Sequence, residues 1–143
     1  MNRQRERQRR GLVILASILC LFLLTACHKE LPALSSKFEP VKVEEKAQSV
    51  IALVNAQDGQ AMREMGTEEI KESLTDEAMQ PVYDALEKAG AFKEIKDIQL
   101  AGNTDSAGQE YGVFVAKAVY EKKSFIVTIT FTPDMKLSGL FFK

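Results

Sequence analysis

The apolar residues change their spacing once along the chain, and this change constrains the fold more than any other feature. Between residues 43 and 89 they recur every three or four positions, as on one face of an α-helix. From residue 92 onward they favour alternate positions, as on one face of a β-strand. Helices that precede strands, rather than alternating with them, predict an α+β fold with helices packed on one face of an antiparallel sheet.

The helical half divides at residues that favour helix ends. The first helix has one apolar face, made of Val43, Ala47, Val50, Ile51 and Val54. Asp58-Gly59 ends this helix, and a short helix around Met62 follows. Thr67 and Thr75 are suited to cap the next two helices, because a threonine oxygen can accept a free N–H of the first turn. We expect Pro81 to start or kink the last helix, since proline has no N–H.

The second half contains three or four strand candidates. Phe92–Leu100 alternates irregularly, which indicates a β-bulge, and residues 102–109 have the composition of a loop. Clear alternation follows over 111–120, 125–131 and 137–142, with a proline turn before the last strand. The expected sheet is therefore a meander of three to four antiparallel strands.

The first 26 residues have the pattern of a bacterial export signal. Residues 1–10 hold five arginines, and residues 11–26 carry no charge. As a helix this uncharged run reaches about 24 Å, which is short for a hydrocarbon core of roughly 30 Å. Its length instead suits the apolar region of a signal peptide, and its positive flank stays in the cytoplasm. We therefore expect everything after residue 26 to cross the membrane.

The uncharged run leads into Leu24, Thr25, Ala26 and Cys27, which resemble the bacterial lipobox. The resemblance implies cleavage before Cys27 and a diacylglycerol on its thiol, with acyl chains such as palmitate. We expect a lipoprotein on the outer face of the cytoplasmic membrane, or in the outer membrane of a Gram-negative host. The alternatives are an ordinary secretory signal and an uncleaved anchor. Cys20 leaves with the signal peptide, so the mature domain has no cysteine for a disulfide.

Residues 27–40 are expected to be the lipidated cysteine and a flexible tether. The stretch after Cys27 contains two prolines and two serines and has no regular apolar spacing. We place a single α+β domain at residues 41–143, because the 117 residues after the signal peptide suffice for one domain and not for two.

Five short segments of the chain are similar to a bacterial family, the domain of unknown function 3887. They are Asn55–Gly59, Leu74-Thr75, Val82–Leu86, Ala91–Ile95 and Gly139–Phe142. The similarity covers roughly residues 44–142. It implies the cone of nuclear-transport-factor-two-like and cystatin-like proteins, in which a curved antiparallel sheet wraps around helices. Members occur as small lipoproteins and ahead of α/β-hydrolase domains. This chain has no Gly-x-Ser-x-Gly motif, so hydrolase activity is not carried over.

The domain carries no catalytic or metal-binding signature. His28 is the single histidine and lies in the tether, so the domain lacks the base of a Ser-His-Asp or Cys-His mechanism. Cysteine and histidine clusters that bind zinc are absent, and the acidic stretch 68–77 lacks the loop spacing of a calcium site. Residues 27–143 hold 14 Lys/Arg against 19 Asp/Glu, a balance that repels nucleic acid. We expect no enzyme, cofactor, metal or nucleic-acid partner.

We expect a non-catalytic binding or interaction module whose ligand is unknown. The candidate pocket or interface is the second sheet face, with Ile126, Thr128 and Thr130, and with Phe114 and Tyr120 beside them. A homodimer or another envelope protein is the expected partner, and an ordinary solvated threonine-rich strand is the plain alternative.

Two further alternatives concern catalysis. A pocket enzyme of the cone fold would use an Asp/Tyr pair, with Asp97 as the base and Tyr83, Tyr111 or Tyr120 as the donor, on fold analogy alone. The domain could also be the accessory partner of a separate hydrolase.

Overall fold

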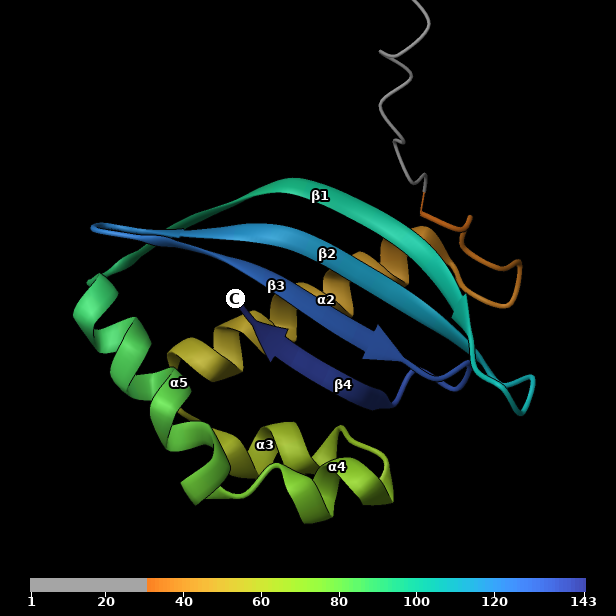
Figure 1. The fold of residues 1–143 in the computed structure, drawn as a ribbon, viewed down its shortest axis with the longest axis horizontal. Helices are drawn as coiled ribbons and strands as arrows, with labels where there is room; N and C mark the ends of the chain where they lie inside the picture. Colours follow the sequence, from red (N-terminus) through yellow and green to blue (C-terminus); the bar gives the residue numbers. More distant parts are fainter. Residues whose placement is uncertain (1–30) are drawn as a thin grey trace, which may run out of the picture. The chain divides into compact units, whose positions relative to one another are not determined.

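The computed structural model describes residues 31–143, so the expected signal peptide and Cys27 lie outside the described part of the chain. Within it, helices come first and strands follow (Figure 1). The helices are α2 (Pro40–Asn55), α3 (Gly59–Glu64), α4 (Glu68–Ser73) and α5 (Asp76–Ala89). The strands are β1 (Phe92–Thr104), β2 (Glu110–Tyr120), β3 (Ser124–Phe131) and β4 (Leu137–Phe142). This order confirms the predicted α+β class. None of the helices in residues 31–143 is both long and apolar enough to cross a membrane.

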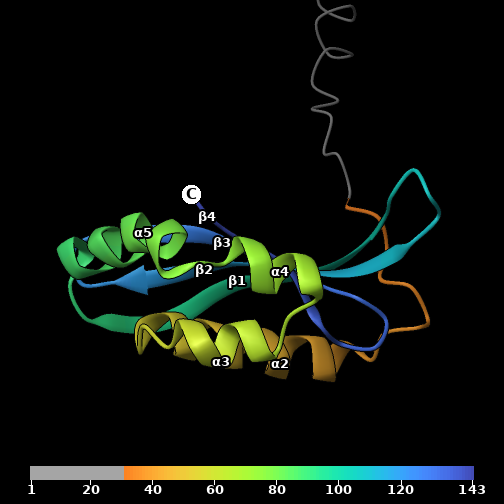
Figure 2. The same ribbon diagram turned by 90° about the horizontal axis from the view of Figure 1, so that it is seen from below.

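The four strands form one open antiparallel sheet in the order β1-β2-β3-β4, so β1 and β4 are its edges. The strands arch over α2, which runs across one face of the sheet, whereas α4 and α5 lie beyond the β4 edge (Figure 1). Figure 2 shows α2 and α3 together on one side of the sheet. The opposite face is not covered by any helix of the described residues.

The core lies between α2 and the covered face of the sheet. All five residues of the predicted apolar face of the first helix are buried. They pack with buried side chains of β2 and β3 such as Phe114, Val127 and Ile129. The 3.6-residue period of the sequence therefore identified the buried face of this helix correctly.

The helix ends also agree with the caps predicted from the sequence, apart from the position of one proline. The Thr67 and Thr75 hydroxyls accept hydrogen bonds from the N–H groups of Ile70 and Ala78, at 3.4 and 3.1 Å. Both threonines therefore cap helices as predicted. Pro81 does not start α5, because it is the sixth residue of a helix that already begins after the Thr75 cap.

The folded part of the chain begins before Val41, the start that the sequence predicted. The Phe38 side chain is buried, and a Cβ at Gly112 would lie 2.8 Å from its ring. The Gly102 N–H donates to the Pro32 carbonyl at 2.8 Å. Part of the expected tether is therefore packed against the sheet. Its one aromatic residue, Phe38, is buried against Gly112, where the missing side chain leaves room for the ring.

Strand β1 is longer than predicted and contains a bulge. It continues to Thr104, so the loop expected over 102–109 shrinks to 105–109. Its pairing with β2 shifts register twice, and Asp97, between Lys96 and Gln99, has a φ of 54°. The bulge that the irregular alternation predicted is thus present.

Candidate functional site

The structure separates the predicted interface residues onto two opposite faces of the sheet. Phe114 pairs with Ile129 in β3, is 0% exposed and belongs to the core, as does Tyr120 at 4%. Ile126 is 46% exposed and shares the other face with Thr128 and Thr130. Residues directly opposite in paired strands share a face, so Phe114 and Tyr120 cannot lie beside Ile126. That part of the prediction is wrong.

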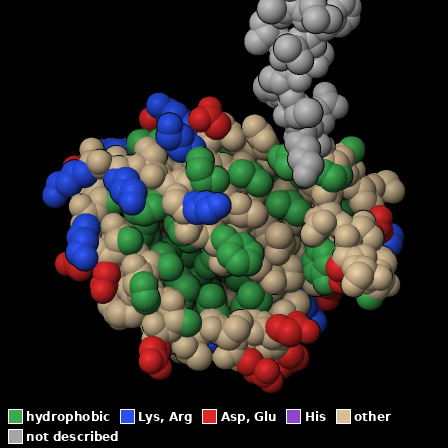
Figure 3. Space-filling view, viewed as in Figure 1, with side chains coloured by type: hydrophobic (Ala, Val, Ile, Leu, Met, Phe, Trp, Pro, Cys, Tyr) green, Lys and Arg blue, Asp and Glu red, His purple; other side chains and the backbone are tan. Residues whose placement is uncertain are grey.

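We call the uncovered side of β2, β3 and β4 the outer sheet face. Its side chains include Val113, Val115, Lys117, Val119, Ile126, Thr128, Thr130 and Phe141. Phe141 is 65% exposed and lies next to Thr128, which in turn pairs with Val115. Seen from this side, Figure 3 shows hydrophobic side chains gathered near the middle of the molecule. The face is semi-apolar, as its sequence predicted.

The candidate acid–base residues do not form one cluster. Tyr83 and Tyr120 line a hollow of about 310 Å³ between the ends of α2 and α5 and the start of β1. The Tyr120 hydroxyl donates to Asn55 Oδ1 at 2.7 Å, and burial raises its pKa. The Tyr83 hydroxyl is buried and has no hydrogen-bond partner among residues 31–143.

The other two candidates lie elsewhere. Asp97 is exposed on the β1 bulge and does not line that hollow. The Tyr111 hydroxyl donates to Asp105 Oδ2 at 3.2 Å, and burial raises the Tyr111 pKa, with a further contribution from Asp105. The geometry therefore brings together two tyrosines and an asparagine, without the aspartate that the acid–base alternative needs.

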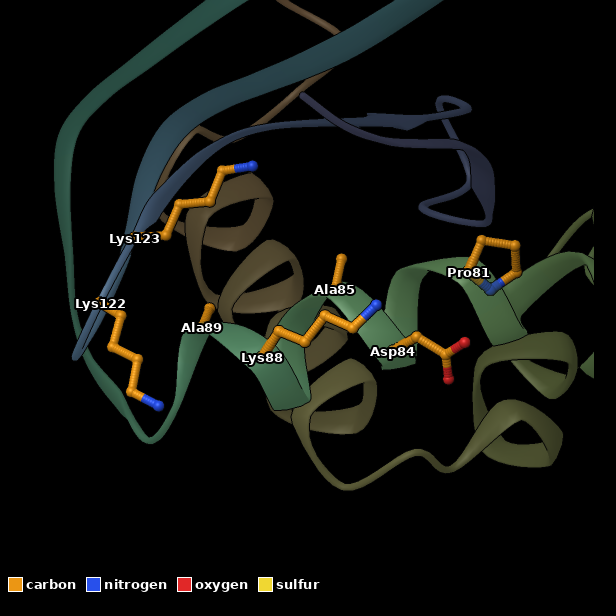
Figure 4. Close-up of a pocket in the computed structure, with 7 residues that line it drawn as sticks. All are labelled: Pro81, Asp84, Ala85, Lys88, Ala89, Lys122 and Lys123. Atoms are coloured by element: carbon orange, nitrogen blue, oxygen red, sulfur yellow. The ribbon is translucent and has the colours of Figure 1, made fainter.

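A groove that the sequence did not reveal runs between α5 and the sheet. Its first part holds about 540 Å³ between α5 and the β2–β3 turn, and Figure 4 shows α5 on one side and Lys122 and Lys123 on the other. The second part holds about 340 Å³ and reaches the end of β4. Both parts share Pro81, Ala85 and Lys123, and together we call them the lysine groove.

The first part of the lysine groove is positively charged. Lys88, Lys122 and Lys123 line it, and no carboxylate of residues 31–143 lies within 4.0 Å of their ammonium groups. Asp84 also lines it, but its carboxylate accepts a hydrogen bond from Gln80 at 2.7 Å and points away from the turn lysines (Figure 4). Three lysines and one aspartate therefore line one hollow, which has a net positive charge.

The nearby Glu121 forms no ion pair within 4.0 Å with these lysines. Its carboxylate accepts from the Ala91 N–H and from Lys93, each at 3.2 Å. The Ala91 N–H, and next the hydrogen bond and charge of Lys93, hold the pKa of Glu121 below its usual range, and the charge of Lys122 also helps to lower it. The Glu121 carboxylate therefore makes its hydrogen bonds with residues at the start of β1.

The second part of the lysine groove is apolar. Val82 and Leu86 of α5 face Phe125 and Phe142 of the sheet across it. The rings of Phe125 and Phe142 pack edge to face at 6.4 Å, and the Lys123 ammonium lies 4.8 Å from the Phe125 ring centre. Aromatic faces attract cations, so this contact places a lysine at the junction of the two parts. The groove can hold a ligand with an apolar portion and a negative charge.

Sequence reasoning missed the groove because its two walls are far apart in the chain. Lys88 and Lys122 are 34 positions apart, and neither lies in a recognisable motif. The adjacent pair Lys122-Lys123 between two strands has the ordinary composition of a solvated turn. No signal in the sequence showed that α5 would stand opposite this turn.

Two of the seven acidic side chains of α4 and α5 form ion pairs with neighbouring bases. Glu68 pairs with Lys71 at 2.6 Å, and Asp76 pairs with Arg63 at 2.8 Å. Residues 31–143 contain no group of three or more His, Cys, Asp or Glu arranged to hold a metal ion.

Comparison with known proteins places the chain in a family but gives no activity. No curated protein matches it. The NMR structure of a protein from Ruminococcus gnavus ATCC 29149 is similar to it, with a TM-score of 0.70 and 24% identity. The match covers 78% of this chain and 96% of that one, and at this identity it shows a shared fold. Residues 47–140 match the family described as protein of unknown function (DUF3887). The chain therefore belongs to the DUF3887 family, as the resemblance in its sequence indicated.

Proposed function

We propose that the protein is a cell-envelope lipoprotein whose domain is a non-catalytic binding module, and that the lysine groove is its ligand site. The observation that carries this proposal is the set of three lysines that have no ion-pair partner among residues 31–143 and that lie beside an apolar floor. The region after the signal peptide is acidic overall, with 14 Lys/Arg against 19 Asp/Glu. A local positive patch on an acidic surface attracts and orients anionic ligands. The ligand therefore combines negative charge with an apolar part.

The expected anchor supports a ligand that approaches from the aqueous side. Leu31 is four positions after Cys27, a span of at most about 14 Å. Pro32, the next residue, is held at the sheet because its carbonyl accepts a hydrogen bond from the Gly102 N–H. Gly102 in turn pairs with Gly112 of β2. Lys122 follows Gly112 by ten positions, just after the end of β2, which corresponds to about 33 Å of extended chain. The described segment that follows the expected anchor thus lies at one end of the sheet, and the lysine groove lies at the other end.

An anionic apolar dye tests the site. The full chain in phosphatidylcholine nanodiscs is titrated with anilinonaphthalene sulfonate, and the signal of empty nanodiscs is subtracted. Lys122→Gln with Lys123→Gln should weaken binding roughly fivefold, equivalent to ~1 kcal/mol for two exposed ammonium groups.

The matched control removes the same charge elsewhere. Lys46→Gln with Lys117→Gln takes two lysines that, like the turn pair, have no carboxylate within 4.0 Å in residues 31–143. This control should bind the dye like the unmodified chain. Equal affinity of all three chains would show that the lysine groove is not the anion site.

A further inference from the structure

We propose that the ligand of the lysine groove is an extended acidic peptide that adds to the free edge of β4 as a fifth strand. This inference rests on the proposed function for the location of the site, and it names the class of ligand. The fifth strand would lie between β4 and α5, with its acidic residues at the β2–β3 turn.

Strand β4 is an edge strand with unused backbone groups. The Ile126 and Lys143 backbones exchange two hydrogen bonds, at 2.9 and 3.0 Å, so Lys143 faces β3. Pairing groups alternate along an antiparallel strand, and the N–H and C=O groups of Leu140 and Phe142 therefore point away from β3. These outward groups have no backbone partner among residues 31–143.

The start of the same edge is already paired, and this limits the length of the site. Leu137 donates to the Met65 carbonyl and accepts from the Thr67 N–H, both at 2.9 Å. The linker between α3 and α4 therefore occupies the β4 edge at its first residue. The free edge is the stretch from there to Phe142, which fits a segment of about four residues.

The groove meets this free edge at its end, at Phe142 and Lys143. Phe142 and Lys143 form one wall of its apolar part, and Val82, Ala85 and Leu86 of α5 form the opposite wall. Figure 3 shows hydrophobic side chains in the hollow between the places that Figure 1 gives to β4 and α5. An added strand would lie between β4 and α5 and direct its side chains alternately to the two faces of the sheet, because successive side chains of a strand point to opposite faces.

The positive charge sits at one end of the added strand. Lys123 lines both parts of the groove and is therefore next to the end of β4. Lys and Arg side chains gather on the left of Figure 3, where Figure 1 places the β2–β3 turn. Backbone pairing with β4 would supply affinity, and acidic residues beside Lys88, Lys122 and Lys123 would supply specificity. A membrane surface fits less well, because the groove lies far from the segment that follows the expected anchor.

Hydrogen exchange measured by mass spectrometry tests the fifth strand directly. The probe is a peptide of two Val–Thr repeats followed by two glutamates, added to the full chain in phosphatidylcholine nanodiscs. We expect the peptide to slow amide exchange in the fragment 137–143 and to leave the other edge strand, β1, unchanged. N-methylation of the probe's valines removes backbone donors and should weaken binding at least tenfold.

Each outcome separates this inference from the proposed function. If the N-methylated probe binds equally well and exchange in 137–143 does not change, strand addition is wrong, although dye binding could still depend on Lys122 and Lys123. If phosphatidylglycerol vesicles bind at these lysines and the peptide does not, the ligand is a membrane surface and the peptide is excluded. If Lys122→Gln with Lys123→Gln changes neither the affinity for the dye nor the affinity for the peptide, the proposed function is wrong as well.

Discussion

At the scale of single residues, the position of a side chain in the strand register decides whether it stabilises the core or faces solvent. Phe114 is fully buried, whereas Ile126 lies on the outer sheet face. We predict that Phe114→Ala lowers the free energy of unfolding by about 3–5 kcal/mol, because it leaves a cavity. Ile126→Thr should cost less than about 1 kcal/mol. Urea unfolding measures both changes, and equal losses would contradict the assignment of faces.

The buried Tyr120 should make stability depend on alkaline pH. Burial raises the pKa of its hydroxyl, so the folded chain keeps the proton after the unfolded chain has lost it. The free energy of unfolding should therefore be constant below the usual tyrosine pKa of about 10 and fall as the pH rises above it. Tyr120→Phe should make this fall shallower. Urea unfolding at several pH values tests the sign, and an identical fall in both chains would refute it.

At the scale of elements, the bulge in β1 is a local feature with a measurable cost. Asp97 adopts a φ of 54°, a conformation that glycine takes without strain. We predict that Asp97→Gly raises the free energy of unfolding by about 1 kcal/mol. The control, Gln99→Gly, changes the first residue of β1 that pairs with β2 after the bulge, and it should lower the free energy of unfolding by roughly 0.5–1 kcal/mol. A loss of stability in Asp97→Gly would mean that the carboxylate itself holds the bulge.

Elements whose signals are local were predictable from the sequence. The buried face of α2 and the two threonine caps depend on residues within a few positions of one another, and both are found in the structure. The outward and inward faces of β2 were not predictable in the same way. Its two alternate sets contain Val113 and Val115 on one side and Phe114 and Ala116 on the other, so both sides are apolar. Only pairing with β3 and packing on α2 decide between them.

Features that depend on contacts between segments far apart in the chain could not be predicted from the sequence. Phe38 is buried because it packs against Gly112, 74 positions later in the chain. No residue near Phe38 indicates this contact. The lysine groove likewise needs α5, the β2–β3 turn and β4 to be in place. Separation in sequence, rather than weak chemistry, explains why the candidate site could not be predicted.

At the scale of the whole molecule, the expected lipid determines where the domain acts. We predict that Cys27→Ser abolishes incorporation of radiolabelled palmitate and releases the chain from the membrane fraction. The physical reason is that two or three acyl chains, at about 0.8 kcal/mol per buried CH₂, provide stable anchoring. A processed Cys27→Ser chain that still sediments with membranes would contradict lipidation at this residue.

The central claim is that charge at the lysine groove selects the ligand, and a charge reversal tests it most directly. Fluorescence anisotropy of two labelled peptides, each with two Val–Thr repeats and ending in two glutamates or two lysines, gives their affinities for the full chain in phosphatidylcholine nanodiscs. The unmodified chain should prefer the acidic peptide, and the chain with Lys122→Glu and Lys123→Glu should prefer the basic one. If both chains bind both peptides with the same affinities, the lysine groove does not select the ligand and the account is wrong.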